Sequence, residues 1–419
     1  MPLARLTGLV SKAFLPKPPD SIAVAVSGGS DSMALLHLMH DLCDRHATRL
    51  FAVTVNHGLR EGAAAEARQV AEHCAQLGIP HETLIWTDWD GKGNLQAEAR
   101  DARYRRMAEW AGSLGIRSIV VGHTADDQAE TVLMRLARRA GVDGLSAMPP
   151  RTMRYGIDWV RPLLSATREE LRMYLRQRGI GWSDDPSNDD IRYVRIKARK
   201  ALAALQDLGI DATGLAVVAG QMRDARVALD WQTFLAAREL ARVTAGAVVL
   251  DERRLRIQPE EIQRRLLVRA LIWISGSDYP PRRNAVATLV AALRGGQAAT
   301  VDGCLALRVG EDIWICREHA AVRDLRADPD ALWDGRWRLR ASDENRTRDG
   351  LHIAALGPEG IAQCADWRAA GLPLQVLQST PAVWRDDTLV AAPLAGNDQN
   401  WHAALESDEE TFFAGLLSH

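Results

Sequence analysis

Four short motifs in this chain combine residue types that can bind a nucleotide and a cationic substrate. The first follows an apolar stretch at Ile22–Val26 and precedes another at Met33–Leu36, and it reads Ser27-Gly28-Gly29-Ser30-Asp31-Ser32. This order predicts a strand, a glycine turn and the start of a helix, whose free backbone N–H groups bind anions. The Lys followed by Ser or Thr that a Walker loop requires is missing. We therefore expect this loop to hold a pyrophosphate leaving group, with Asp31 as a ligand of its Mg²⁺.

Two further motifs supply hydrogen-bonding groups and cations. One is the run Asn56-His57-Gly58-Leu59-Arg60, which follows a predicted strand and, taken alone, is more typical of a surface loop. The other lies on a predicted helix, where Arg100, Arg103 and Tyr104 share one face. Arginines placed in this way can clamp a triphosphate or stabilise charge that develops during a reaction, although a solvated charged face fits equally well.

Acidic residues gather in the run Gly122–Thr131, directly after the fourth predicted strand. Thr124 can cap the next helix, and Asp127 and Glu130 lie on one face of it. Acidic groups at the start of a helix are also favourable for stability alone. Because His123 stands at the end of the strand beside them, we favour a functional site.

A basic segment follows in the second half of the nucleotide region. Five cations lie close together around Tyr193, namely Arg192, Arg195, Lys197, Arg199 and Lys200. Arg192, Arg195 and Arg199 are expected on one face of a helix. Basic side chains with an interleaved aromatic suit RNA phosphates and a stacked base. An ordinary solvated helix face is the alternative.

Strand and helix patterns alternate through the first third of the chain. Strands are expected at Ile22–Val26, Leu50–Val55, Thr83–Trp86 and Ser118–Val121. Helices are expected at Met33–Leu42, Ala63–Leu77, Leu95–Leu114 and Asp126–Ala137. This alternation predicts a doubly wound α/β fold, in which a parallel sheet carries helices on both faces. Ligands of such folds bind at the carboxyl ends of the strands where the strand order reverses, which is where these motifs fall.

From Ser165 onwards the pattern becomes mostly helical. A capping box, Thr167-Arg168-Glu169-Glu170, opens a helix that ends at Gly179. A long helical region follows from Ile191, with a bend expected near Asp211. Later elements are predicted as helices at Pro259–Ile274 and Arg283–Leu293 and as short strands at Ala299–Val301, Leu305–Val309 and Ile313–Cys316. The polar stretch 317–334 has the composition of a linker, and the acidic stretch Glu406–Glu410 is expected to be solvated.

Composition limits the class of protein. A chain of 419 residues is expected to form two or three domains. Its formal net charge of -2 excludes a uniformly basic nucleic-acid coat, so any RNA contact must come from local patches. The isolated cysteines argue for a reducing cytoplasm and against a zinc or iron–sulfur site, and they are Cys43, Cys74, Cys304, Cys316 and Cys364. No apolar run approaches the roughly 20 residues that span a bilayer, so no membrane association is expected.

Taken together, these motifs resemble those of the bacterial tRNA(Ile)-lysidine synthetases, members of the PP-loop ATP pyrophosphatase group. SGGSDS alone matches the SGGxDS signature of the whole group, which includes GMP, NAD and argininosuccinate synthetases and tRNA thiolases. The narrower matches are NHGLR, ARDARY, the run Gly122–Met148, RPLL at Arg161–Leu164, and WSDDPSNDDIRYVR at Trp182–Arg195. They cover roughly the first 200 residues, and the remaining half resembles the family in outline.

The resemblance implies a fold and three domains. These are a PP-loop catalytic domain of the adenine nucleotide alpha hydrolase type at 1–205, a mostly helical tRNA-binding domain at 206–325, and a small α+β domain at 326–419. It also implies that the enzyme ligates free L-lysine to the wobble cytidine of tRNA(Ile) with a CAU anticodon. ATP first adenylates the cytidine, and lysine then displaces AMP. The chain would act in the cytoplasm as a monomer or homodimer.

The resemblance also implies roles for individual residues. ATP would be bound by Ser27–Ser32 and His57, with Asp31 as the Mg²⁺ ligand. Arg100 would stabilise the transition state of adenylation. Lysine would be bound by Asp127 and Glu130, with His123 assisting proton removal. Contacts to tRNA would come from Arg192, Arg195, Lys197 and Arg199, and further ones from Arg253, Arg254, Arg264, Arg265, Arg282 and Arg283.

Three other functions remain open at this stage. A tRNA thiolase shares the adenylation step but would need a persulfide or cluster cysteine pair, and Cys43 and Cys74 are isolated. An amidotransferase would need a glutaminase partner or an N-terminal cysteine nucleophile, whereas Pro2 follows the first Met. A degenerate module that only holds RNA would not need the acidic and basic set of Asp31, Arg100 and Asp127.

Overall fold

The computed structural model describes residues 2–56, 63–86, 95–183, 194–277, 279–343 and 348–417. The chain divides into two compact units, residues 1–226 and 227–418, and the division falls within one helix, α9 (Ala212–Leu240). Each unit is described by itself. The predicted domain boundaries at 205 and 325 remain predictions.

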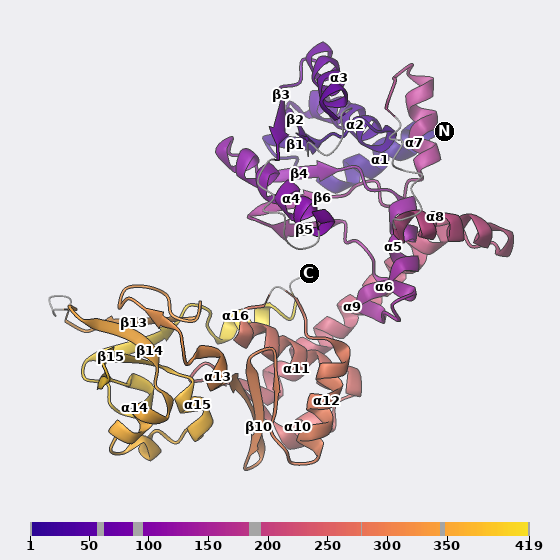
Figure 1. Cartoon of the computed structure of the whole chain (residues 1–419). Helices are drawn as coiled ribbons and strands as arrows, with labels where there is room; N and C mark the ends of the chain where they lie inside the picture. The colour runs from indigo at the N-terminus through magenta and orange to yellow at the C-terminus, as the bar shows by residue number, and fades with distance from the viewer. Residues whose placement is uncertain are drawn as a thin grey trace. The chain divides into compact units, whose positions relative to one another are not determined.

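The first unit is built on a six-stranded sheet in the order β3-β2-β1-β4-β6-β5 (Figure 1). Its strands are β1 (Ser21–Ala25), β2 (Arg49–Asn56), β3 (His81–Ile85), β4 (Ser118–Val121), β5 (Arg151–Arg154) and β6 (Ile157–Val160). All neighbouring strands pair in parallel except the edge strand β5, which is antiparallel to β6. The strand order reverses between β1 and β4, so these two carboxyl ends define the expected ligand-binding edge.

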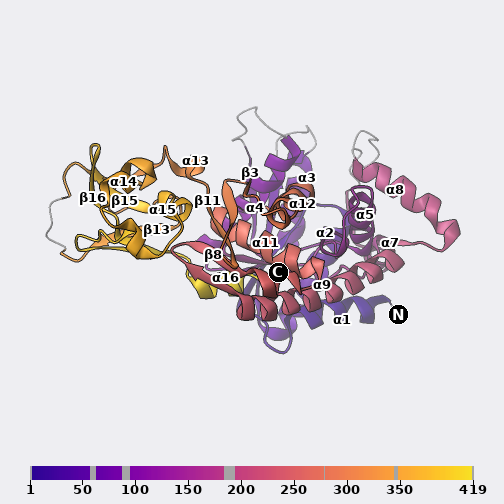
Figure 2. The same cartoon turned by 90° about the horizontal axis from the view of Figure 1, so that it is seen from below.

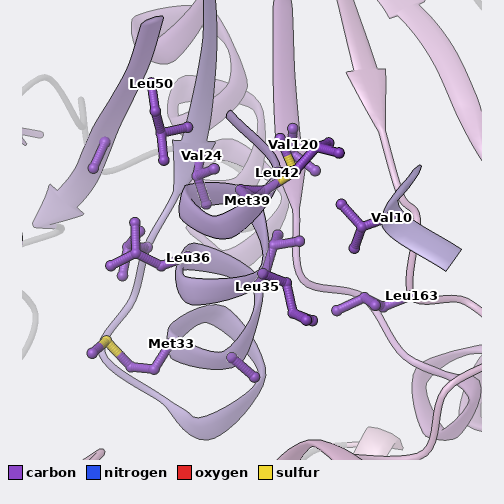
Figure 3. Close-up of a cluster of buried hydrophobic side chains, with 14 of the residues drawn as sticks. Val10, Val24, Met33, Leu35, Leu36, Met39, Leu42, Leu50, Val120 and Leu163 are labelled. Carbon is purple, nitrogen blue, oxygen red and sulfur yellow. The ribbon is translucent and has the colours of Figure 1, made fainter. Parts of the chain in front are cut away.

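Helices cover both faces of this sheet, as predicted. They are α1 (Pro2–Phe14), α2 (Ser30–His46), α3 (Ala63–Gln76), α4 (Leu95–Ser113), α5 (Ala125–Leu136), α6 (Val142–Leu145), α7 (Arg168–Gln177) and α8 (Val194–Leu205). Alternate residues of β1 serve two cores: Ile22 and Val24 pack with α1, α2 and α7, whereas Ala23 and Ala25 pack with α4. Figure 3 shows the first core, where Leu35, Leu36 and Met39 of α2 lie against Val24 and Val120.

The second unit contains a five-stranded antiparallel sheet in the order β7-β8-β11-β10-β9. The strands are β7 (Ala241–Thr244), β8 (Ala247–Asp251), β9 (Ala299–Val301), β10 (Cys304–Val309) and β11 (Asp312–Arg317). Packed with it are α9, α10 (Glu252–Arg256), α11 (Glu260–Ser275), α12 (Arg283–Arg294) and α16 (Glu409–Ala414). This region was expected to be mostly helical. β7 and β8 escaped prediction because a short, fully buried apolar run such as Ala247–Leu250 has no strand-specific periodicity.

The rest of this unit contains two small antiparallel sheets with short helices. Four strands pair in the order β12-β14-β15-β16, and two others, β13 and β17, pair with each other. The strands are β12 (Arg326–Ala327), β13 (Trp337–Ala341), β14 (Leu351–Ala355), β15 (Pro381–Arg385), β16 (Thr388–Ala391) and β17 (Trp401–Leu405). The helices are α13 (His319–Val322), α14 (Gly357–Gln363) and α15 (Leu374–Gln378).

One stretch differs from its sequence-based expectation and another agrees with it. The expected linker 317–334 is packed, because Val322 and Trp333 are buried and Arg317 forms an ion pair with Asp334. A charge-rich composition therefore does not distinguish a linker from a segment that ion pairs hold in place. The acidic stretch Glu406–Glu410 is exposed throughout, as expected, and its ion pairs with Arg338 and Arg238 lie on the surface.

The bend expected near Asp211 is present. α8 and its short extension to Leu208 meet α9 at 99° (Figure 2). Over the residues described, no single helix has the length and apolar content to cross a membrane, and only this bent pair passes a test of length and composition.

Candidate active site

The loop between β1 and α2 is closed by its own side chains. Gly28 has a φ of 86°, which lies in the left-handed region that favours glycine, and Gly29 caps α2 with extended backbone. The Ser32 hydroxyl accepts a hydrogen bond from the Ser27 amide at 3.1 Å and donates one to the Gly29 carbonyl at 3.0 Å. The turn therefore surrounds the start of α2, where the first amides of a helix have no partner within that helix. This geometry fits the predicted anion-binding loop.

The end of β4 touches the same loop. A Cβ placed on Gly122 would stand 3.0 Å from the Asp31 carbonyl oxygen and 3.2 Å from the Ser32 nitrogen. Only glycine permits this approach without displacing the backbone. The contact brings the residues that follow β4, beginning with His123, beside the start of α2. The strand switch point thus joins the loop Ser27–Ser32 to the acidic run Gly122–Thr131, both of which the sequence analysis places directly after strands.

Asp127 is fixed by a capping box at the start of α5. The Asp127 carboxylate accepts hydrogen bonds from the amide and the hydroxyl of Thr124, at 2.9 Å and 3.0 Å. Burial acts to raise the pKa of Asp127, but His123, Arg195, Arg168 and the Thr124 amide outweigh it, so the pKa lies below its usual value. Asp127 is therefore a buried carboxylate that stays ionised at neutral pH.

His123 lies beside this carboxylate with an unused nitrogen. Its Nδ1 is buried and has no hydrogen-bond partner among the described residues. Burial lowers the pKa of His123 to about 3, against the opposing effect of Asp127 and with help from Arg161 and Arg100. The imidazole is therefore neutral at physiological pH and can accept a proton or a hydrogen bond.

Glu130 binds two arginines that were predicted to contact RNA. The Glu130 side chain is only 1% exposed, and its Oε1 accepts a hydrogen bond from Arg199 Nε at 2.5 Å. Its Oε2 lies 2.8 Å from Arg195 Nε in an ion pair. Arg195 and Arg199 do share a face of α8, as predicted, and that face is turned towards α5. Lys197 and Lys200 are exposed on the remainder of the helix.

Arg168, which sequence reasoning assigned only to a helix start, is part of the same cluster. Its Nε donates to Asp31 Oδ2 at 3.1 Å, and its Nη2 lies 3.6 Å from Asp127 Oδ1. Charged partners raise the pKa of Arg168 despite its burial. Its position after the capping Thr167 gave no sign of this role, because the contacts join elements far apart in the sequence.

Helix α4 contributes Arg100 and Tyr104 beside the cluster of His123 and Asp127. Arg100 is exposed and lies over the Tyr104 ring, 5.4 Å from its centroid. Burial acts to raise the pKa of Tyr104, but Arg100 and Arg161 outweigh it. Arg161 follows β6, is buried, and donates to Thr152 Oγ1 at 3.1 Å. Arg161 was noted only within the RPLL match, and its burial in this polar environment could not be read from that motif.

The structure brings together Asp31, His123, Asp127, Glu130, Arg195 and Arg199 and adds Arg168 to them. His57 and Arg192 lie outside the described residues. Of the arginines expected along the tRNA path, Arg265 is a buried structural residue paired with Asp230 and Glu261, and Arg264 also pairs with Glu261. Arg253, Arg282 and Arg283 are exposed.

The donor set around Asp31 suits one kind of metal. In the described part of the chain, no group of three or more His, Cys, Asp or Glu residues is arranged to hold a metal ion. A site built only from protein ligands is therefore not supported there. Asp31 offers one partly exposed carboxylate beside an anion-binding loop. Mg²⁺ commonly binds to one or two carboxylates together with substrate phosphates, so the residues present fit that ion.

Comparison with known families agrees with this geometry. Residues 4–205 match the family described as PP-loop domain, which places the first unit among the PP-loop nucleotide-binding proteins. Over nearly its whole length the chain is 53% identical to the tRNA(Ile)-lysidine synthase of Ruegeria pomeroyi, covering 97% of this chain and 96% of that one. It is 35% identical to the protein of the same name from Wolbachia pipientis wMel, covering 93% and 91%. The chain belongs to the tRNA(Ile)-lysidine synthase family.

Two further likenesses cover less of the chain. A tRNA(Ile)-lysidine synthase from Mesorhizobium japonicum is 38% identical over 81% of this chain and 76% of its own. Among solved structures, the U34-tRNA thiolase NcsA from Methanococcus maripaludis with its [4Fe-4S] cluster is similar at 16% identity and a TM-score of 0.47. That likeness covers 54% of this chain and 78% of the thiolase.

Proposed function

We propose that this chain, an ATP-dependent ligase of the lysidine synthase family, joins free L-lysine to the wobble cytidine of tRNA(Ile) with a CAU anticodon. In the first step the 2-keto oxygen of the cytidine attacks the α-phosphorus of ATP and pyrophosphate leaves. In the second step the ε-amine of lysine attacks the ring carbon of the cytidine that bears this oxygen. The new carbon–nitrogen bond replaces the carbon–oxygen bond to AMP, and the amine loses its proton to a base.

The first step uses the loop Ser27–Ser32 and its surroundings. The amides at the start of α2 bind the leaving pyrophosphate, with the dipole of the helix in their favour. Asp31 holds Mg²⁺, which when bound neutralises charge on the phosphates. Arg100, exposed at the edge of the site, stabilises the charge that grows on the phosphorus oxygens. His57 completes the nucleotide site in this proposal.

The second step uses the residues at the start of α5. Asp127 attracts the lysine ammonium because it is ionised and, among the described residues, its Oδ1 takes part only in long ion pairs, 3.6 Å from Arg168 and 3.9 Å from Arg195. Glu130 adds negative charge behind it, with its own oxygens committed to Arg195 and Arg199. The neutral His123 accepts the proton that the amine releases. Its low pKa rises when phosphates bring negative charge near it, which improves it as a base.

The tRNA is held by exposed cations on both units. Its anticodon loop is single-stranded, so the target base can be unstacked at modest cost. Lys197 on α8 and the exposed Arg253, Arg282 and Arg283 are suited to phosphate contacts. We retain Arg192, Arg195 and Arg199 as candidates for tRNA contacts. Arg195 and Arg199 would contact RNA from the side of α8 on which they pair with Glu130.

One observation carries the proposal: Asp31, His123 and Asp127 converge at the carboxyl ends of β1 and β4, the two strands between which the sheet order reverses. A pyrophosphate loop and an ammonium-binding carboxylate therefore lie side by side, which a two-step ligase requires. The thiolase alternative is less well supported. All five cysteines are buried and free, and burial raises the pKa of Cys43 to about 12 and that of Cys74 to about 11.

The test is tRNA-dependent exchange of pyrophosphate into ATP, followed by incorporation of labelled lysine into total tRNA. Asp31→Ala and Arg100→Ala are each expected to lower the rate of exchange by at least about a thousandfold, because each removes charge stabilisation from the first step. Matched controls are Asp44→Ala on α2 and Arg105→Ala on α4, which are exposed. Exchange at parental rates in Asp31→Ala or Arg100→Ala would reject that residue's role. A parental chain that transfers no lysine would reject the function.

A further inference from the structure

Arg168 is held rigidly at the place where three elements of the first unit meet. It is the first residue of α7, directly after Thr167, whose amide donates to Glu170 Oε2 at 2.7 Å in a capping box. The Arg168 amide donates to Asp126 Oδ2 at 2.7 Å, which ties the start of α7 to the start of α5. The backbone at Arg168 is therefore fixed by the capping box within α7 and by its hydrogen bond to α5.

Each nitrogen of the Arg168 guanidinium faces a different carboxylate. Nε donates to Asp31 on α2, while Nη2 and Nη1 lie 3.6 Å from Asp127 Oδ1 and 3.9 Å from Glu130 Oε1 on α5. The side chain is 22% exposed, so these attractions are only partly screened by water. Asp127 also acts on Asp31 as a like charge, which places these two carboxylates close to each other.

We propose that Arg168 is a positioning residue that holds Asp31 and Asp127 together and so joins the pyrophosphate side of the active site to its lysine side. The inference rests on the proposed function, which gives each carboxylate its own substrate. Without Arg168 the two carboxylates repel each other and the loop at the start of α2 loses its only described side-chain ion pair. A planar fork is needed, because the three guanidinium nitrogens are separate atoms that each face one carboxylate, whereas the donors of an ammonium all leave a single nitrogen at the end of a flexible chain.

The removal of Arg168 has opposite effects on the two sides. Negative charge is left unbalanced beside the phosphate loop, which disfavours binding and reaction of the triphosphate. The same unbalanced charge attracts the ammonium of lysine more strongly. A residue that merely supported the fold would weaken both sides together, so this divergence identifies a positioning role.

The experiment compares Arg168→Ala and Arg168→Lys with Arg176→Ala. Arg176 lies on the same helix and pairs with Glu169 in an exposed ion pair of 2.9 Å, so it is a matched control. Exchange of pyrophosphate into ATP is measured with tRNA, and L-lysine binding is measured by calorimetry without nucleotide or metal. Arg168→Ala is expected to lower exchange about a hundredfold and to bind L-lysine about three to ten times more tightly. Millimolar guanidinium is expected to restore part of the exchange.

The remaining variants make the proposal falsifiable. Arg168→Lys is expected to stay below about a tenth of the parental exchange rate, and Arg176→Ala is expected to match the parental chain in both measurements. The role of Arg168 is overturned if Arg168→Lys exchanges at the parental rate, or if Arg168→Ala loses exchange and lysine binding together. A parental chain without tRNA-dependent exchange would instead overturn the proposed function.

Discussion

The loop Ser27–Ser32 and the charged cluster around Glu130 lie in one unit but are built in different ways. The side-chain hydrogen bonds that close the loop join residues at most five positions apart, and one backbone bond from a distant segment, from the Ser183 amide to the Gly28 carbonyl at 2.9 Å, supports them. The groups that would bind its ligand are largely backbone amides. The cluster joins Glu130 to Arg199 and Arg168 to Asp31, across 69 and 137 positions. A local, backbone-built site is visible in six letters of sequence. A site built from long-range ion pairs becomes visible only when the strand order is known.

The largest expected effect comes from the contact that links the two regions. Gly122→Ala would force a Cβ to within 3.0 Å of the Asp31 carbonyl oxygen, so the phosphate loop must shift. We expect tRNA-dependent pyrophosphate exchange to fall about thirtyfold, because the loop backbone must give by a few tenths of an ångström, and a misplacement of about 1 Å costs catalysis about a hundredfold. Calorimetry should still detect lysine binding, since the cluster does not depend on the loop's backbone.

Gly112→Ala on α4 is the matched control for this substitution, because a Cβ there meets nothing within 4 Å. It should leave exchange unchanged and slightly stabilise the helix. If Gly122→Ala exchanged at the rate of Gly112→Ala, the loop would not depend on its contact with β4. The two regions would then be independent of each other.

The next largest effect is a loss of folding stability when the charged cluster around Glu130 is altered. Glu130→Gln keeps the shape of the side chain but leaves Arg195 and Arg199 without their common counter-charge. We expect a loss of about 2 kcal/mol in the free energy of unfolding, below the full value for a buried pair because both arginines are about a third exposed. Urea unfolding followed by fluorescence measures it. Glu109→Gln, exposed on α4, is the control, and equal stability of the two variants would contradict a structural role for Glu130.

The smallest effect separates the two sides of α8. Lys197 is exposed, whereas Arg195 is paired with Glu130. Lys197→Ala is therefore expected to reduce the salt dependence of tRNA binding by about one unit in the slope of log K against log salt concentration. Arg195→Ala is expected to weaken binding with less change in the slope. Filter binding across a salt series measures both, and an equal or greater change for Arg195→Ala would show that its guanidinium leaves Glu130 for a phosphate.

Much of the nucleotide-binding fold could be predicted because its signals are local. The strand Ser118–Val121 is found as predicted, and α4 and α5 begin and end within one residue of expectation. The alternating pattern also predicted a ligand-binding edge at the carboxyl ends of the strands, whereas the structure shows that β1 and β4 flank the point where the order reverses. In contrast, β5 was missed because its pattern, Arg151–Arg154, is exposed and polar, and β6 because it is only a short apolar run. These strands carry the chain to Arg161 and α7.

Arg168 shows why the remainder of the site was not predictable. In sequence it is an unremarkable residue at a helix start, and its neighbours Thr167 and Glu170 explain the local pattern fully. Its importance depends on which strands lie beside β1, because that order brings α2, α5 and α7 together. Arg195 and Arg199 gave the opposite difficulty: their shared face was predicted correctly, but the buried carboxylate that it meets lies on a distant element.

The position of α16 has a consequence for how the protein is made. Phe412 and Phe413 are buried in the core formed by α11, β8 and β10, although the whole segment β13–β17 is translated between them. That core cannot close until α16 has emerged from the ribosome, whereas residues 1–226 can complete their sheet while synthesis continues. During this interval Trp273 on α11 lacks Phe412, whose ring it meets edge to face with centroids 5.9 Å apart. The second unit is therefore the part of the nascent chain that most needs chaperones to protect its exposed apolar surface.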